Sequence, residues 1–268
     1  MQQKMVVFTD LDGTLLDYTT YSYEKALDAL RLLKEKEVPI IFCSAKTRAE
    51  QEIYHQELHI NDPFIVENGG AIFIPRGYFP FTFDHTKITR DYFVIELGIP
   101  YSKIRAKLKK VEKELGLELR GFGDLSAEDV AKDSGLSLEF ATRAKQREYT
   151  ETFIIGGEKD KKAALQKIEE EGLNWTHGGR YYSAMGGSDK GKAVNILTNL
   201  FKKKLNGIET IGIGDSQNDL PMLAAVNTPV LLQKPGDLWE EINLANIHRV
   251  EGMGPEGWSK AIKILLGE

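Results

Sequence analysis

The chain of 268 residues has one cysteine, so it cannot contain an internal disulfide bond. No apolar run approaches the ~18 residues of a membrane span, and no signal-peptide pattern precedes the first strand pattern. The net charge of −5 lacks the basic excess typical of nucleic-acid binding. These absences predict a cytoplasmic protein that binds neither membranes nor nucleic acid. The cysteine, Cys43, ends the apolar run 38–42 and is expected to be a buried structural thiol.

Two acids, Asp10 and Asp12, follow the apolar strand pattern at residues 6–9 and precede a turn at Gly13. Side chains alternate along a strand, so both carboxylates are expected to point the same way. Ligands of open α/β sheets bind beyond the carboxyl ends of the strands, which predicts that both acids face a pocket. Two neighbouring carboxylates need a cation or a shared proton. This suits phosphoryl transfer with Mg²⁺, in which one aspartate is the nucleophile and the other the proton donor.

Other interpretations of this stretch are a calcium loop and a plain turn. A calcium loop of the EF-hand type needs glycine at its sixth position and glutamate at its twelfth. Counted from Asp10, these positions hold Leu15 and Tyr21, which disfavours calcium. A turn between a strand and a helix stays open on this stretch alone, because Asp-Gly is a common turn dipeptide.

The periodicity of apolar residues predicts an α/β protein with an inserted second domain. Strand patterns at 6–9, 38–43 and 64–66 alternate with helix patterns at 23–37 and 47–58, which predicts a parallel sheet with helices on its faces. From about residue 84 the pattern changes to strands set between helices, including a strand at 92–97 and a helix at 101–115. The parallel pattern returns after residue 187. We therefore expect a core formed by residues 1–84 and 186–268, with residues 85–185 inserted.

Two further polar groups are expected at the same edge of the sheet. Ser44 ends the second strand, where its hydroxyl can bind a phosphate oxygen or simply cap the next helix. Lys190 lies at a helix start in the segment 186–193, which nearly matches a nucleotide-binding phosphate loop. Ala193 occupies the position of the hydroxyl that such a loop needs. We therefore interpret Lys190 as a positive charge placed against Asp10 and a phosphate.

A second acidic pair, Asp215 and Asp219, follows the apolar strand pattern at 209–214. Asp215 can ligate magnesium, and Asp219 can orient the metal's surroundings or bind Lys190. A dinucleotide-binding loop is disfavoured, because Gln217 occupies the third glycine position counted from Gly212. A helix cap would explain one of the two acids but not both.

Together these motifs resemble those of the haloacid dehalogenase-like phosphohydrolases. The matching segments are 10–14, Ser44, Lys190 and 214–219. The resemblance implies a Rossmann-like parallel-sheet core with an inserted α/β cap domain. It further implies that Asp10 is the nucleophile, Asp12 the general acid/base, and Ser44 and Lys190 phosphate ligands. The implied metal ligands for Mg²⁺ are Asp10, Asp12 through its backbone carbonyl, Asp215 and Asp219.

Segments 44–50, 62–69, 147–151 and 178–182 more closely resemble those of mannosyl-3-phosphoglycerate phosphatases. This implies a small phosphorylated glycoside of glycerate as the substrate, hydrolysed through an aspartyl-phosphate to mannosylglycerate, a compatible solute. This substrate carries a phosphate and a carboxylate, so we expect a local cationic pocket in this acidic protein. Arginine can bind the glycerate carboxylate with two parallel hydrogen bonds, and polar side chains can bind the hydroxyl groups. The candidate substrate ligands are Lys46, Arg48, Glu67, Asn68, Arg143, Arg147, Arg180 and Ser188.

Several alternatives stay open at this point. The glucosyl analogue or a hexose phosphate could be the substrate of another capped phosphatase. A phosphomutase and a non-catalytic phosphosugar-binding module would share much of the motif set. The sequence does not predict an oligomeric state.

Overall fold

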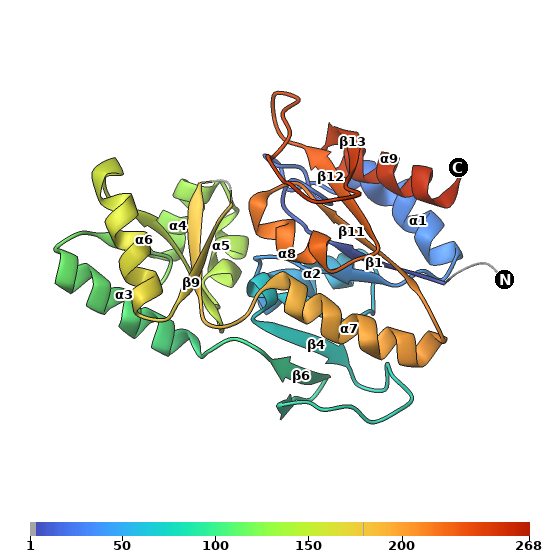
Figure 1. Cartoon of the computed structure of the whole chain (residues 1–268), viewed down its shortest axis with the longest axis horizontal. Coiled ribbons are helices and arrows are strands. Elements are labelled where there is room, and N and C mark those ends of the chain that lie inside the picture. The colour runs from blue at the N-terminus through green and yellow to red at the C-terminus, as the bar shows by residue number, and fades with distance from the viewer. Residues whose placement is uncertain (1–3, 179) are drawn as a thin grey trace.

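The computed structural model describes residues 4–178 and 180–268. Its central parallel sheet has the order β13-β12-β11-β1-β2 (Figure 1). The strands are β1 (Met5–Thr9), β2 (Ile40–Phe42), β11 (Glu209–Gly214), β12 (Thr228–Gln233) and β13 (His248–Met253). A parallel bridge between Cys43 and Ile65 adds β3 (Phe64–Val66) beside β2. The expected α/β fold with a parallel-sheet core is confirmed.

Helices cover both faces of this sheet because alternate residues of each buried strand point to opposite sides. On β1, Val7 packs in one apolar cluster with residues of α1 (Leu27–Glu35), α2 (Arg48–Glu57) and α9 (Gly254–Leu266). Val6 and Phe8 pack in the other, with α7 (Lys190–Leu205) and α8 (Leu220–Ala224). Figure 1 shows α1 and α9 on one side of the sheet and α7 on the other.

A second, antiparallel sheet has the order β3-β4-β6-β5, with β4 (Ala71–Pro75), β5 (Lys87–Ile88) and β6 (Tyr92–Glu96). The strand expected at 92–97 therefore pairs with β4, next to core strand β3. The domain boundaries at 85 and 185 stay a prediction. Hydrogen bonding attaches β5 and β6 to the core strands, and the third sheet begins after them.

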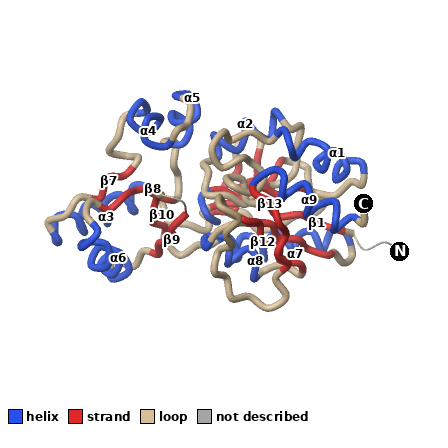
Figure 2. Tube along the Cα trace, turned by 90° about the horizontal axis from the view of Figure 1, so that it is seen from above, coloured by secondary structure: helices blue, strands red, loops and turns tan. Residues whose placement is uncertain are grey.

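We call the elements from α3 to β10 the cap. Its sheet has the order β7-β8-β10-β9, and α3 and α6 pack on it through a separate apolar cluster. Figure 2 shows these elements gathered apart from the central sheet. The cap elements are α3 (Tyr101–Leu115), β7 (Leu119–Gly121), α4 (Ala127–Ser134), α5 (Leu138–Ala144), β8 (Thr150–Ile155), α6 (Lys161–Glu170), β9 (Asn174–Gly178) and β10 (Tyr181–Met185).

The chain enters and leaves the cap at neighbouring points. A Cβ atom on Gly186, just after β10, would lie 2.4 Å from the Cγ1 atom of Ile99, just before α3.

Short 3-10 helices complete the fold, at Glu24–Ala26, Glu67–Gly69, Glu158–Asp160 and Gln217–Asp219. Among residues 4–178 and 180–268, no helix has the length and apolar character needed to cross a membrane.

The single thiol lies in the core as expected. Cys43 is fully buried between the central sheet and α7. Burial raises the pKa of its thiol, because the charged thiolate loses its hydration. The prediction of a buried structural cysteine is confirmed.

Candidate active site

A buried ion-pair network lies at the carboxyl end of β1. The ammonium of Lys190, the first residue of α7, donates to Asp10 Oδ1 at 2.7 Å and to Asp219 Oδ1 at 2.6 Å. Its side chain is 0 % exposed, and those of Asp10 and Asp219 are 6 % and 0 %. The two carboxylates outweigh the effect of burial and raise the pKa of Lys190, so the ammonium stays charged. Sequence segments 180 residues apart thus meet at one point.

The loop after β11 brings Asp215 to the same place. Asp219 Oδ2 accepts the backbone N–H groups of Asp215 at 3.0 Å and of Ser216 at 3.1 Å, which fixes the loop. Gly13 has φ +76°, and a Cβ atom there would lie 2.9 Å from Asp215 Oδ2. The Asp-Gly turn after β1 is therefore needed both for its left-handed backbone and for its missing side chain.

The residues at this point fit a divalent cation. Carboxylate oxygens of Asp10, Asp215 and Asp219 all lie within 4.8 Å of one another. Three carboxylates and one ammonium leave two negative charges in a buried space. Burial raises the pKa of Asp10 to about 7, although Lys190 opposes the rise, and burial raises that of Asp215 well above its ordinary value. Mg²⁺ prefers hard oxygen ligands and would offset this repulsion.

Asp12 lies in a different environment from Asp10. Its side chain is 42 % exposed, while its Oδ1 atom is buried and lies 2.9 Å from the Lys46 ammonium, outside the cluster of three carboxylates. Lys46 is buried, also lies 3.5 Å from Glu50, and has its ammonium 5.0 Å from the centre of the Tyr21 ring. The Asp10 side chain is thus almost fully buried, whereas that of Asp12 is partly exposed, which suits two separate roles.

Two cavities lie between cap and core beside these acids. A cavity of ≈150 Å³ is lined by Asp12, Lys46, Asn68, Arg147 and Tyr181, among others. A larger one of ≈660 Å³ lies next to it and is lined by residues including Asn68, Trp175, His177, Ser188, Lys190 and Asn218. Asn68 and Asn218 line both cavities, and Asn218 Nδ2 donates to Asn68 Oδ1 at 3.4 Å. The cavities together form a space in which polar side chains stand among apolar surface, which suits a substrate with two differing halves.

Among the buried polar atoms that have no hydrogen-bond partner within the described part of the chain are Asn68 Nδ2 and Ser188 Oγ. Both residues are at most 3 % exposed and line the larger cavity. Buried polar groups are normally paired, so these atoms are suited to bind a ligand. Ser44 is buried as well, and its Oγ accepts the backbone N–H of Lys46 at 3.3 Å.

The other predicted substrate ligands, Arg48, Arg143, Arg180 and Glu67, line neither cavity and contact other residues of the chain. Arg48 pairs with Glu52 at 3.0 Å and Glu148 at 3.2 Å, and Arg143 pairs with Glu139 at 2.7 Å. None of these three ionic partners, and neither arginine, lines either of the two cavities. Their roles as substrate ligands stay predictions.

Arg180 and Glu67 are the extremes of exposure among these candidates. Arg180 is 58 % exposed and lies 3.6 Å from Asp133 of α4. Glu67 is fully buried, and its carboxylate accepts backbone N–H groups of residues 148–150. The charge of a residue could not show whether it is exposed, as Arg180 is, or buried within the chain, as Glu67 is, because arginine and glutamate also occur in ligand sites.

Several cavity residues received no role from the sequence, among them Asn218 and Tyr181. Asn218 belongs to the motif 214–219 but is not ionisable, and Tyr181 lies in a segment singled out only by resemblance. The signal for Asn218 was its place between two acids that were themselves recognised. For Tyr181 the alternation along β10, which turns its side chain toward the cavity, was the available signal.

This geometry agrees with the relatives of the chain. The model of the haloacid dehalogenase-like hydrolase family matches residues 7–91 and 125–236. The chain belongs to that family, and the prediction of a phosphoric monoester hydrolase is confirmed at the level of the enzyme class.

More particular similarities concern whole chains. The chain is 50 % identical to a glucosyl-3-phosphoglycerate/mannosyl-3-phosphoglycerate phosphatase of Methanococcoides burtonii, over 99 % of this chain and 98 % of that one. It is 40 % identical to a mannosyl-3-phosphoglycerate phosphatase of Pyrococcus furiosus, over 92 % and 96 %. A solved Thermoplasma acidophilum structure has a TM-score of 0.69 at 18 % identity and 99 % coverage of both chains, which shows the common fold. The expected resemblance to mannosyl-3-phosphoglycerate phosphatases is confirmed.

Proposed function

We propose that the protein hydrolyses the phosphate monoester of mannosyl-3-phosphoglycerate to mannosylglycerate and phosphate. The names of relatives that are 50 % and 40 % identical over nearly the whole chain support this substrate. The first of these names also includes the glucosyl compound, which is therefore the alternative substrate. The observation that carries the reaction type is the buried contact between Asp10 and Lys190 at the carboxyl end of β1.

Asp10 attacks phosphorus in this mechanism and forms an aspartyl-phosphate, while the C3 oxygen of the glycerate leaves with a proton from Asp12. Asp12 then accepts a proton from the water that attacks phosphorus, which releases phosphate and restores Asp10. The open position of Asp12 supports its part, since a group that exchanges protons with substrate and water must be accessible. Lys190 holds Asp10 in place and stabilises negative charge on the transferring group.

Mg²⁺ would be held by Asp10, Asp215, the backbone carbonyl of Asp12 and, directly or through water, Asp219. It would supply the positive charge that lets an anionic nucleophile approach a phosphate dianion. The two excess negative charges of the carboxylate cluster support a divalent ion. Asp219 also fixes the N–H groups of its own loop, so its removal would disturb the metal ligands as well.

The substrate would lie in the two cavities. Lys46 next to Asp12 is suited to the glycerate carboxylate, and Asn68 and Ser188 offer unpaired polar atoms for hydroxyl groups. Arg147 contributes charge to the smaller cavity, although most of its donors are used within the chain. A cytoplasmic location is part of this proposal, because the substrate is a metabolite.

The test compares phosphate release from mannosyl-3-phosphoglycerate, glucosyl-3-phosphoglycerate, mannose 6-phosphate and 3-phosphoglycerate, with Mg²⁺ and at matched concentrations. We expect kcat/KM to be at least about a hundredfold higher for the glycosylated phosphoglycerates, or about 2.7 kcal/mol of differential transition-state binding. Equal or faster hydrolysis of hexose phosphate would refute the substrate and leave a general sugar-phosphate phosphatase. Rearranged phosphosugar in place of free phosphate would indicate a mutase, and binding without turnover a binding module.

A further inference from the structure

Glu67 joins the core to the cap through main-chain hydrogen bonds. It follows β3, and its carboxylate is 0 % exposed. Oε1 accepts the N–H of Glu148 at 2.8 Å, and Oε2 accepts those of Tyr149 at 3.0 Å and Thr150 at 2.8 Å. The Thr150 hydroxyl donates a further bond to Oε2 at 2.8 Å. A core carboxylate thus holds the segment that begins cap strand β8.

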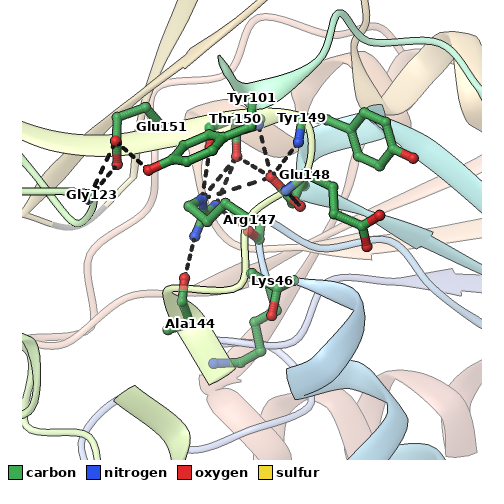
Figure 3. A network of polar contacts seen from close by, with 12 residues as sticks. Lys46, Tyr101, Gly123, Ala144, Arg147, Glu148, Tyr149, Thr150 and Glu151 are labelled. Carbon is green, nitrogen blue, oxygen red and sulfur yellow. Dashed lines mark hydrogen bonds and ion pairs between the residues drawn. The ribbon is translucent and has the colours of Figure 1, made fainter. Parts of the chain in front are cut away.

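Arg147 makes the reverse connection, from the cap to the core. Its Nη2 donates to the Ala45 carbonyl, next to Ser44, at 2.9 Å, and to the Thr150 hydroxyl at 2.8 Å (Figure 3). Its Nε lies 3.7 Å from Glu67 Oε2 and donates to the Thr150 carbonyl at 3.0 Å. The Thr150 hydroxyl therefore donates to the acid and accepts from the base. We call Glu67, Arg147 and Thr150 the clasp.

The bonds and the position of Glu67 decide what it can do. Its carboxylate accepts four hydrogen bonds from residues 148–150, one at Oε1 and three at Oε2, and Glu67 lines neither of the two cavities. If the Glu67 carboxylate turned toward a ligand, it would lose these bonds and leave buried N–H donors and a buried charge without partners, which is unfavourable. Glu67 is therefore suited to hold the chain in place and not to bind the substrate.

The same loop also reaches the reacting centre. Glu67 and Asn68 both have left-handed backbones, with φ of 50° and 56°. This bend places the Asn68 side chain in both cavities, against Asn218 of the loop that carries the metal-site acids. The Gly70 carbonyl accepts the N–H groups of residues 97 and 98 at 2.9 and 2.8 Å, where the chain leaves for the cap. Anchoring the cap and placing Asn68 are thus tasks of one short loop.

We propose that Glu67 is a positioning residue, which fixes the start of β8 on the core and thereby sets Asn68 and the cap face toward the part of the substrate beyond the phosphate. This role rests on the proposed function only for the identity of the substrate, whose glycosyl half would contact the cap.

Hydrogen exchange of the backbone amides tests the clasp without any substrate. In Glu67→Gln, an amide N–H group faces the N–H donors of residues 148–150, so we expect those amides to exchange at least about tenfold faster, with central-sheet amides unchanged. Thr150→Val removes the shared hydroxyl at nearly equal size and should produce a smaller acceleration at the same amides. Glu128→Gln, an exposed cap residue with the same loss of charge, is the control and should match the wild type. Unchanged exchange at 148–150 in both clasp variants would overturn the proposal.

Kinetics test the consequence for the reaction. For Glu67→Gln we expect kcat/KM for mannosyl-3-phosphoglycerate to fall at least about tenfold, while p-nitrophenyl phosphate, which has no glycosyl half, loses at most about threefold. If Glu67→Gln does not fold, Thr150→Val carries the same comparison. Equal losses on both substrates would overturn the positioning role. A wild-type protein that hydrolyses the aryl phosphate but not the glycosylated one would refute the proposed function, and the exchange experiment would still decide the clasp.

Discussion

Asp10→Asn is expected to abolish turnover and, in the absence of metal, to stabilise the protein at alkaline pH. The carboxylate of Asp10 is buried beside those of Asp215 and Asp219, where Lys190 offsets one of three negative charges. The asparagine keeps an oxygen that can accept from the lysine and removes one charge from the cluster. Function and stability should therefore change in opposite directions, as is common where an active site stores electrostatic repulsion.

The size of the gain follows from the pKa of Asp10. Burial is the main cause that raises this pKa from 3.8 to about 7. An acid with a higher pKa in the folded chain binds more protons there, so the free energy of unfolding falls as pH rises between these values. The fall amounts to about 4 kcal/mol above pH 7, at about 1.4 kcal/mol for each tenfold change. We expect the variant to be about 2–4 kcal/mol more stable at pH 8 and about 1–2 kcal/mol at pH 5.

Urea unfolding followed by tryptophan fluorescence, in EDTA at both pH values, measures this difference. Asp84→Asn, at an exposed position, is the control for a lost charge. Added Mg²⁺ should stabilise the wild type more than Asp10→Asn, because it binds the folded carboxylate cluster. A variant less stable than the wild type at pH 8 in EDTA would refute the reasoning. So would a difference in the free energy of unfolding between variant and wild type that is equal at both pH values.

Three further perturbations test individual contacts. Gly13→Ala should lower kcat at least about a hundredfold, because its Cβ would lie 2.9 Å from Asp215 Oδ2 in a left-handed backbone; wild-type kcat would contradict this. Lys46→Met should lower kcat at least about tenfold on any phosphate monoester, since Asp12 loses the ammonium 2.9 Å away, and an effect on KM alone would argue against it. Cys43 should react with iodoacetamide only after unfolding, because burial raises its pKa; rapid labelling of the native protein, read by mass, would be the contrary result.

The meeting of Asp10, Lys190, Asp215 and Asp219 could be predicted because it follows from sheet geometry. Parallel strands place their carboxyl ends at one edge, and Asp10, Asp215 and Asp219 follow the ends of β1 and β11. Lys190 begins α7, the helix that follows the cap and leads into β11. The position of each residue relative to the neighbouring strand or helix pattern is what predicts its place at this edge of the sheet. The roles of these residues in the reaction stay predictions.

The contacts that Glu67 and Arg147 make between core and cap could not be predicted in the same way. Their residue types indicate charge, but these contacts reach backbone groups about 80 to 100 residues away, for which the sequence has no local signal. The strand at 92–97 illustrates the same limit in the fold. Its apolar pattern predicts a strand, whereas its pairing with β4 depends on where the chain turns.

The adjacency of Ile99 and Gly186 has a meaning for the history of such proteins. Because the cap's two ends meet, a short turn could replace the stretch between them and leave the order of the central sheet unchanged. Gene rearrangements could therefore exchange, enlarge or trim this module while the acids and the lysine keep their places. Selection could then alter which molecule is accepted without rebuilding the chemistry, so that one reaction serves many metabolites.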